Sequence, residues 1–273
     1  MKSWGRVLLL VSFLLNGPAG FAEMTETEQA LKKPQASSVQ EAGKRWWRSN
    51  LFTEYSRVGI GDRKTTWKET AAGLIHFGER FIPYFEASRH ERSGEADLAY
   101  SAGVYLKEQD SLTHAEAGIG TDTDYLYDSK VLLEREQRLS GGLYWKAGAK
   151  YLSYAENDVY VVSPGLVYYI GDHSLRFDYN VSFIESRGDA HFGSLKGNFQ
   201  MTPEAALWAG AAYGRRLYDI HPIEASEQEG FIVFGGFEFK FLEDIFLRIG
   251  VSYAEEKPDF RKRGVEAGVS FRF

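Results

Sequence analysis

The last nine residues of the chain, Val265-Glu266-Ala267-Gly268-Val269-Ser270-Phe271-Arg272-Phe273, alternate apolar with small or polar side chains without a break. Side chains of a β-strand point to opposite faces with a period of two residues. The odd-numbered residues from Val265 to Phe273 would therefore share one face, and Glu266, Ser270 and Arg272 would share the other. This pattern predicts a strand in a wall with hydrocarbon on one side and polar groups or water on the other.

The aromatic residues at the end of this strand carry a second indication. A last strand that ends on Phe resembles the C-terminal sorting signal of bacterial outer-membrane β-barrels, and Phe271 and Phe273 would form that signal here. The resemblance implies two kinds of partner. They are the barrel-assembly machinery, which recognises the signal, and the outer-membrane lipids around the folded wall.

The amino-terminal end indicates export from the cytoplasm. Lys2 and Arg6 precede a short apolar run at residues 7–15, which is followed by a helix-breaking Asn-Gly-Pro and small residues up to Ala22. These features are typical of a secretory signal peptide, and the run is too short to span a bilayer as a helix. We expect residues 1–22 to be the signal peptide; a retained membrane anchor is the alternative. The chain has no Cys, which excludes disulfides and a lipidated cysteine.

The composition excludes several classes of protein. The formal net charge is −6 and becomes more negative once Lys2 and Arg6 are removed, so nucleic acid is not an expected partner. The content of 19 Phe, 16 Tyr and 28 Gly with only 7 Pro favours β-structure. No segment after residue 22 approaches the ~20 consecutive apolar residues of a spanning helix, whereas a barrel strand needs only about ten alternating residues.

From residue 50 to the end, the chain repeats a pattern of strand and turn. We expect an all-β fold, a closed antiparallel transmembrane β-barrel of 14 strands, because an even number brings both ends to one side. The expected strands cover about residues 50–60, 66–77, 81–91, 97–107, 112–121, 126–138, 142–154, 159–170, 174–186, 190–201, 205–218, 230–242, 245–255 and 263–273.

Two alternatives to this count stay open. The first, third and sixth expected strands alternate poorly, and Pro83 and Pro164 each lack a backbone donor, so 12 strands is the alternative number. A soluble β-sandwich or lipocalin-like barrel would also alternate, but it would place its polar residues outside and needs fewer strands.

The lengths of the connections predict which end of the barrel faces which compartment. Every second connection is short, from residues 78–80 to residues 243–244, and these would be periplasmic turns. The others, including residues 219–229 and 256–262, are longer and charged, as expected of extracellular loops. Aromatic residues near the expected strand ends would form two girdles at the membrane interfaces. They are Phe77, Phe81, Tyr169, Phe241, Phe271 and Phe273 on the periplasmic side, and Trp67, Tyr151, Phe183, Tyr213 and Tyr253 on the outer side.

Residues 23–49 differ from the rest of the chain. They are polar and end in Lys44-Arg45-Trp46-Trp47-Arg48. We expect a periplasmic N-terminal segment that is either a disordered tether or a segment that enters the lumen or anchors its tryptophans at the interface. The domain organisation is then signal peptide, N-terminal segment, and barrel over residues 50–273.

A family resemblance lies in the stretch Gly142 to Phe183. It contains Pro164-Gly165-Leu166-Val167-Tyr168-Tyr169-Ile170-Gly171 and Ser174-Leu175-Arg176-Phe177-Asp178-Tyr179, and it resembles the YaiO-type outer-membrane β-barrel family. The resemblance implies a barrel over roughly residues 50–273 in the bacterial outer membrane. It also implies a context of surface-polysaccharide components, and it carries over no catalytic residue.

The period of two predicts which side chains line the lumen. Charged residues of both signs fall on the inner side, where they would either form a structural network of ion pairs or also line a path for solutes. Several aromatic residues would accompany them, filling the lumen or stacking on sugar rings. The expected lumen-lining residues are Lys146, Lys150, Arg176, Asp178, Glu238, Lys240, Arg248, Glu266, Tyr105 and Tyr168, with Tyr144, Tyr160 and Trp208 also inward.

The candidates for catalysis and metal binding are weak. His114 and Glu116 would share the inner face of one strand about 7 Å apart, but the third member of a catalytic triad is missing. Asp122, Asp124 and Asp128 offer oxygen ligands for Ca²⁺ without a defined loop motif. We therefore expect no enzyme activity, no cofactor and no metal.

The expected function follows from the size of the lumen. Eight strands leave room only for side chains, whereas sixteen to eighteen surround an aqueous channel, so 14 strands suggest a narrow pore. We expect passage or export of small polar or saccharide solutes. One alternative is a non-conducting structural or binding barrel that acts with a surface-polysaccharide system, and the other is a lipid-modifying enzyme.

Overall fold

The computed structural model describes residues 46–273, except 61, 93, 122, 125, 156, 185–187, 216–228 and 257–259. The expected signal peptide, residues 23–45 and most of the loop at 219–229 lie outside the described residues. Among the described residues, no helix is long and apolar enough to cross a membrane.

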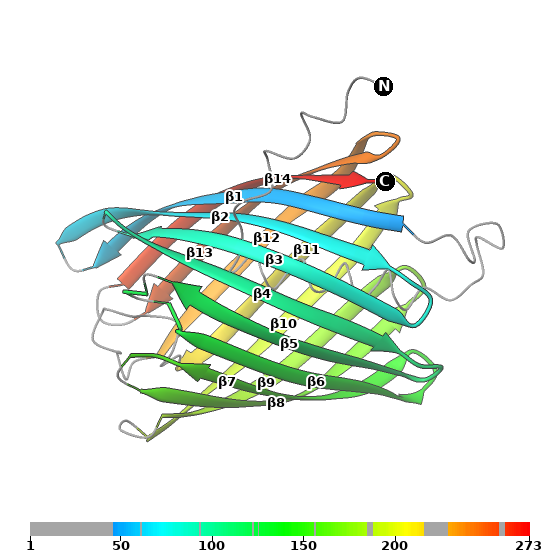
Figure 1. The fold of residues 1–273 in the computed structure, drawn as a ribbon, viewed down its shortest axis with the longest axis horizontal. Coiled ribbons are helices and arrows are strands. Elements are labelled where there is room, and N and C mark those ends of the chain that lie inside the picture. The colour runs from blue at the N-terminus through cyan, green and yellow to red at the C-terminus, as the bar shows by residue number, and fades with distance from the viewer. Residues whose placement is uncertain are drawn as a thin grey trace.

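The structure is a closed antiparallel β-barrel in which each strand pairs with its neighbours in the sequence and β1 pairs with β14 (Figure 1). This confirms the all-β fold with 14 strands and shows that the alternative of 12 was wrong. The strands are β1 (Trp46–Ile60), β2 (Arg63–Phe77), β3 (Phe81–Arg92), β4 (Glu95–Lys107), β5 (Ser111–Thr121), β6 (Ser129–Ser140), β7 (Leu143–Ser153), β8 (Asp158–Ile170), β9 (His173–Ile184), β10 (Gly188–Thr202), β11 (Ala205–Arg215), β12 (Glu229–Leu242), β13 (Ile245–Glu256) and β14 (Phe260–Arg272).

The first and last strands close the ring along their whole lengths. The pairing runs from Arg48 opposite Arg272 to Ile60 opposite Phe260. Beyond it, Trp47 N–H donates to Phe273 O over 2.8 Å and Phe273 N–H donates to Trp47 O over 2.9 Å. The first strand therefore starts at Trp46, before the expected residue 50, because the carboxyl-terminal residues need a partner.

The connections differ between the two ends of the barrel. At the end that holds Trp46 and Phe273, all six connections span two or three residues. Two of these tight turns place Gly141 and Gly171 at φ of 54° and 58°, which a residue with a side chain rarely adopts. Short turns, together with the start of β1 and the end of β14, mark the periplasmic side.

At the opposite end the connections are more varied than expected. The β1–β2 and β3–β4 connections contain only two residues each, because pairing continues to Ile60 opposite Arg63 and to Arg92 opposite Glu95. The β13–β14 connection contains three residues. The longest connection lies between Arg215 and Glu229. The expectation that every outer loop is long was therefore wrong.

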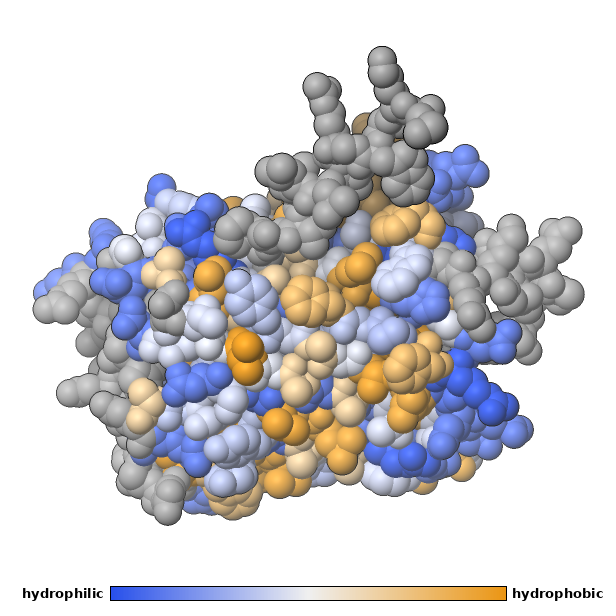
Figure 2. Space-filling model, in the orientation of Figure 1, coloured by the Kyte–Doolittle hydropathy of each residue, from blue (hydrophilic) through white to orange (hydrophobic). Residues whose placement is uncertain are grey.

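The two faces of the wall differ in polarity. On β9, Phe177 and Tyr179 are 46% and 42% exposed on the outer surface, whereas Arg176 and Asp178, which alternate with them, are buried inside. Figure 2 shows apolar side chains gathered across the middle of the outer surface, with hydrophilic residues toward both ends. An apolar band around a polar interior is the arrangement of an outer-membrane barrel.

The aromatic girdles are only partly as expected. Phe81, Phe241 and Phe273 are exposed near the periplasmic end, and Phe183 and Tyr213 near the outer end. Three other expected members face inward instead. They are Phe77, which is buried, Tyr169, which contacts Glu136, and Trp67, whose ring lies 4.4 Å from the Arg92 guanidinium.

Candidate functional site

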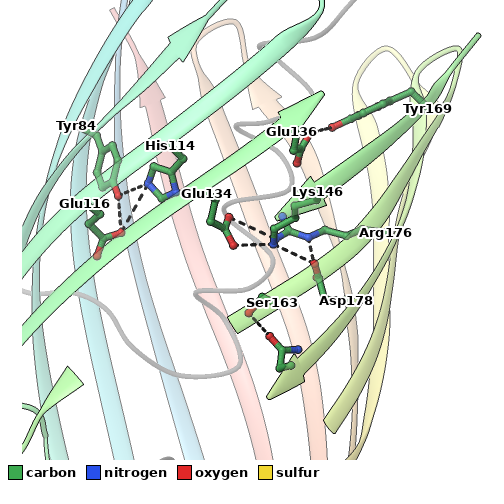
Figure 3. A network of polar contacts seen from close by, with 11 residues as sticks. Tyr84, His114, Glu116, Glu134, Glu136, Lys146, Ser163, Tyr169, Arg176 and Asp178 are labelled. Atoms are coloured by element: carbon green, nitrogen blue, oxygen red, sulfur yellow. Dashed lines mark hydrogen bonds and ion pairs between the residues drawn. The ribbon is translucent and has the colours of Figure 1, made fainter. Parts of the chain in front are cut away.

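A cluster of four charged side chains lies on the inner wall across β6 to β9 (Figure 3). Lys146 Nζ lies 2.6 Å from Glu134 Oε1 and 3.0 Å from Asp178 Oδ1. Arg176 Nε donates to Asp178 Oδ2 over 2.8 Å, and its Nη2 lies 3.6 Å from Glu134 Oε2. All four side chains are buried. We call this group the Lys146 network; its two cations and two carboxylates balance.

A glycine on the intervening strand makes room for this network. Gly165 of β8 lies opposite Lys146 on one side and Asp178 on the other. A Cβ at Gly165 would lie 2.8 Å from Asp178 Oδ1 and 2.6 Å from Phe177 O. The Lys146 side chain can therefore pass over β8 to reach β9, so the ion pairs lie along the wall.

A second cluster lies on the inner wall across β3 to β6 (Figure 3). The Tyr84 hydroxyl lies 2.7 Å from His114 Nε2 and donates to Glu116 Oε2 over 2.5 Å. Lys130 forms an ion pair with Glu116, and the Tyr105 ring stacks on His114 at 4.3 Å. We call these five residues the His114 network.

In the His114 network, too, a glycine on the intervening strand makes room for the side chains. Gly103 lies on β4 between Tyr84 and Glu116, and a Cβ there would overlap the Tyr84 ring. His114 Nε2 and Glu116 Oε2 are 3.8 Å apart, and both contact the Tyr84 hydroxyl. The lysine ion pair and the tyrosine hydrogen bond occupy the carboxylate of Glu116, which would have to orient His114 in a catalytic triad.

Further ion pairs continue along the inner wall where the ring closes. Arg248 Nε donates to Glu266 Oε1 over 2.7 Å, and its guanidinium lies 4.3 Å from the Trp208 ring. Arg48 on β1 pairs with Glu238 on β12 at 3.0 Å. The inner wall is thus lined by ion pairs on both sides of the barrel.

An apolar cluster lies inside the barrel near the outer end. Leu126 and Tyr127 of the β5–β6 connection are buried against residues of five strands. The Asp97 carboxylate holds this connection, since it accepts hydrogen bonds from the backbone N–H of Asp124 at 3.1 Å and of Leu126 at 2.8 Å. We call this group the outer-mouth cluster; its remaining members are Ala99, Leu152, Val159, Val161, Ile184 and Ala190.

Most of the expected lumen-lining residues do lie on the inner face. The buried or partly buried ones with partners named above are Lys146, Arg176, Asp178, Glu238, Arg248, Glu266 and Tyr105. Lys150 is half-buried on the same face of β7 as Lys146, and Lys240 is exposed toward the periplasmic end of β12. Tyr144 and Trp208 also point inward.

Tyr168 and Tyr160 were placed on the wrong face. They are 45% and 52% exposed on the outer surface, while Val161 and Val167 of the same strand are buried inside. Strand β8 is apolar on both faces because its inner side contributes Val159 and Val161 to the outer-mouth cluster. Alternation of polarity therefore could not tell the two faces apart.

Several residues of the site were missed by reasoning from the sequence, among them Glu134, Lys130 and Tyr84. The strand β6 alternates poorly because it buries Leu132 partly on the inner face and exposes Arg135 on the outer one. A usable signal did exist in the sequence. Glu136 and Lys146 lie opposite each other across the tight β6–β7 turn, so Glu136 shares the inner face with Lys146. Glu134, two residues before Glu136, then also points inward.

The candidate metal ligands do not come together in the described part of the chain. The Asp128 carboxylate accepts a hydrogen bond from Thr123, and Asp124 contacts Asp97 through its backbone. Asp122 lies outside the described residues. No group of three or more His, Cys, Asp or Glu side chains suited to a metal ion occurs among those that are described.

Several solved membrane barrels have similar folds and very different sequences. A bacterial polysaccharide outer membrane secretin matches with a TM-score of 0.57 at 10% identity, covering 82% of this chain and 98% of its own. The toluene transporter TodX of Pseudomonas putida matches at 0.55 and 9% identity, over 96% and 94% of the chains. The translocator domain of autotransporter NalP from Neisseria meningitidis matches at 0.51 and 12% identity, over 94% and 97%. No curated protein sequence matches this chain.

A family model matches the sequence itself. The model of the YaiO membrane beta barrel domain covers residues 49–219, which is more than half of the 273 residues. Together with the closed barrel, its apolar outer band and the similar solved barrels, this match confirms the location in the bacterial outer membrane. The chain belongs to the YaiO membrane beta barrel family.

Proposed function

We propose that this barrel is a narrow pore for the passage or export of small polar or saccharide solutes. The observation that carries the proposal is the direction of the inner ion pairs. Each ion pair described above joins strands no more than three positions apart in the ring, so the charged side chains follow the wall. Ion pairs that run along the wall, rather than across the barrel axis, are what a path for a solute would require.

The chemistry of the lining favours hydroxyl-rich solutes. Carboxylates, cations and tyrosine hydroxyls alternate around the wall, so a passing sugar finds donors and acceptors at every step. The cations and carboxylates of the Lys146 network balance, which gives little reason to select strongly for one sign of charge. The rings of Tyr105 and Trp208 also lie inside, but they are buried against His114 and Arg248 and so fill the lumen rather than offer a stacking surface.

The same lining argues against apolar cargo. The toluene transporter has a similar fold, but a similarity below 25% identity extends to the fold alone. An aromatic hydrocarbon would gain little from buried ion pairs and would have to displace the polar contacts that stabilise them. The match to the polysaccharide secretin, at 10% identity, is limited to the fold in the same way. Surface-polysaccharide components as partners are what the family resemblance implies.

One observation favours the non-conducting alternative. The outer-mouth cluster holds the β5–β6 connection inside the barrel through Asp97. A barrel closed in this way could act as a structural or binding module at the surface. We propose no enzyme activity. A lipid-modifying role would need His114, and unchanged outer-membrane lipids in a His114→Ala strain would support its absence.

Planar-bilayer recordings on the refolded chain test the pore directly. We expect small discrete conductance steps, and swelling of proteoliposomes in solutions of small sugars. A variant that lacks residues 23–45 but keeps the complete β1 strand controls for blockage by the N-terminal segment. If both forms insert as heat-modifiable barrels and neither conducts, the pore is refuted and the structural or binding role takes its place.

A further inference from the structure

A group of basic side chains lies on the outer surface of the barrel, near its outer end. Arg261 and Arg263 project outward from β14, Arg57 from β1 and Lys64 from β2, and all four are exposed. These three strands are neighbours in the ring (Figure 1). We call these four residues the basic patch.

The register concentrates positive charge within the patch. Arg57 lies directly opposite Arg263, and Gly59 separates Arg261 from Lys64 in the next outward-facing row. Like charges directly opposite each other in a sheet repel, because their Cβ atoms lie only about 5 Å apart. An anion placed between the two side chains would relieve this repulsion.

Few carboxylates of the described residues neutralise the patch. Glu255 lies 3.6 Å from Arg261, and Glu91 pairs with Lys68 and Arg89 beside the patch. Arg263 lies 5.9 Å from the Tyr253 ring, which leaves its guanidinium free for a further hydrogen-bonded anion. On the inner face, by contrast, neighbouring cations are paired with carboxylates.

The position of the patch relative to the apolar band of the outer surface indicates which kind of anion it would meet. On β13, β14 and β1, the outward-facing row next to Arg57 and Arg263, toward the middle of the barrel, consists of Val251, Val265 and Tyr55, which are 62%, 56% and 48% exposed. These three side chains belong to the apolar band that faces the acyl chains, whereas on β2 the same row holds Lys68, which pairs with Glu91. The basic patch therefore lies where the lipid headgroups of the outer leaflet meet the protein.

We propose that Arg57 and Arg263, with Arg261 and Lys64, bind a phosphate group of an outer-leaflet lipid. The guanidinium groups match phosphate oxygens in a bidentate manner, and Lys64 adds a point charge. The apolar row below receives the acyl chains of the same lipid. The site is a lipid site on the outer wall, and it is independent of whether the lumen conducts.

Native mass spectrometry of the folded full chain in detergent tests this site. The probes are bisphosphorylated lipid A, the same lipid A without its phosphates, and inorganic phosphate. We expect the phosphorylated lipid to bind at least about tenfold more tightly than the dephosphorylated one, because two charge-assisted contacts are involved. The R57Q/R263Q variant should lose this preference, whereas R57K/R263K should keep part of it.

The matched control is Arg135→Gln, which removes an outward arginine paired with Glu108 near the periplasmic end. It should leave the preference unchanged. A preference that survives in R57Q/R263Q, or its absence from the wild type, would overturn the proposal. Binding of inorganic phosphate as tight as that of the phosphorylated lipid would also overturn it, because the site would then be one for free phosphate. If R57Q/R263Q fails to fold, the single variant R57Q is used in its place. Its lipid preference is then compared with that of the wild type, measured with the same two lipids.

Discussion

The middle and the outer mouth of the barrel are built from different interactions. In the middle, the Lys146 network holds four buried charges against the wall through ion pairs that pass over Gly165. At the outer mouth, apolar side chains pack together and the Asp97 carboxylate accepts two backbone hydrogen bonds from the β5–β6 connection. In the proposed pore, the middle would therefore set which solutes pass, and the outer mouth would set whether the lumen is open.

The largest expected effect comes from Lys146→Ala. The substitution leaves Glu134 and Asp178 buried with Arg176 as the remaining cation, so we expect a loss of about 3–5 kcal/mol in the free energy of unfolding. Chemical unfolding from lipid vesicles measures it. Lys240→Ala, which removes an exposed lysine near the periplasmic end, should change it by less than about 0.5 kcal/mol. Equal effects of the two substitutions would show that the Lys146 network does not hold the middle of the barrel.

Gly165→Ala tests the passage of side chains over β8. The added methyl would collide with Asp178 and the Phe177 carbonyl, so we expect a destabilisation of about 1–3 kcal/mol. Alanine is otherwise the better residue in a strand. The matched control is Gly193→Ala, because a Cβ there meets its nearest atom, on the Phe177 ring, at 4.0 Å. The control should be neutral or slightly stabilising, and a Gly165→Ala barrel as stable as the wild type would refute the steric argument.

Asp97→Ala addresses the outer mouth. It removes the acceptor of two backbone N–H groups, which we expect to cost about 1–3 kcal/mol and to release the β5–β6 connection. If the connection narrows a pore, the single-channel conductance should rise. Asp110→Ala, which removes an exposed carboxylate from a periplasmic turn, is the control. A conductance that is unchanged in Asp97→Ala would mean that the outer mouth does not limit passage.

The smallest expected effect concerns the periplasmic turn at Glu108. Hydrogen bonds from Ser111 and Arg135, and the nearby Arg135 charge, lower the pKa of the Glu108 carboxyl. A pKa that is lower in the folded state adds stability above the unfolded value of about 4.3 and loses it as the pH falls through the folded value. Glu108→Gln should therefore be slightly less stable than the wild type at pH 7 and equal to it at pH 3. If the two proteins differed in stability by the same amount at pH 7 and pH 3, the ionised Glu108 carboxyl would not be the cause.

The sequence was sufficient for the barrel where the two faces of a strand differ in polarity. Arg176 and Asp178 alternate with Phe177 and Tyr179, and their placement inside followed from the period of two. On β8 the two faces do not differ in this way, because valines lie inside and tyrosines outside. The period of two also could not reveal partners such as Tyr84 and Glu116, because they lie on strands that are not adjacent and meet over a glycine.

In the proposed pore, the inner face of this wall lines a water-filled path while the outer face meets lipid. The chain has no Cys, so single cysteines can be introduced without background. Lys150→Cys lies on the inner face and Tyr168→Cys on the outer one. In bilayer recordings with a charged, water-soluble thiol reagent, we predict that the current through Lys150→Cys falls as the reagent attaches, whereas that through Tyr168→Cys stays constant. A Lys150→Cys barrel that conducts but never reacts, or a reactive Tyr168→Cys barrel whose current falls, would contradict the account.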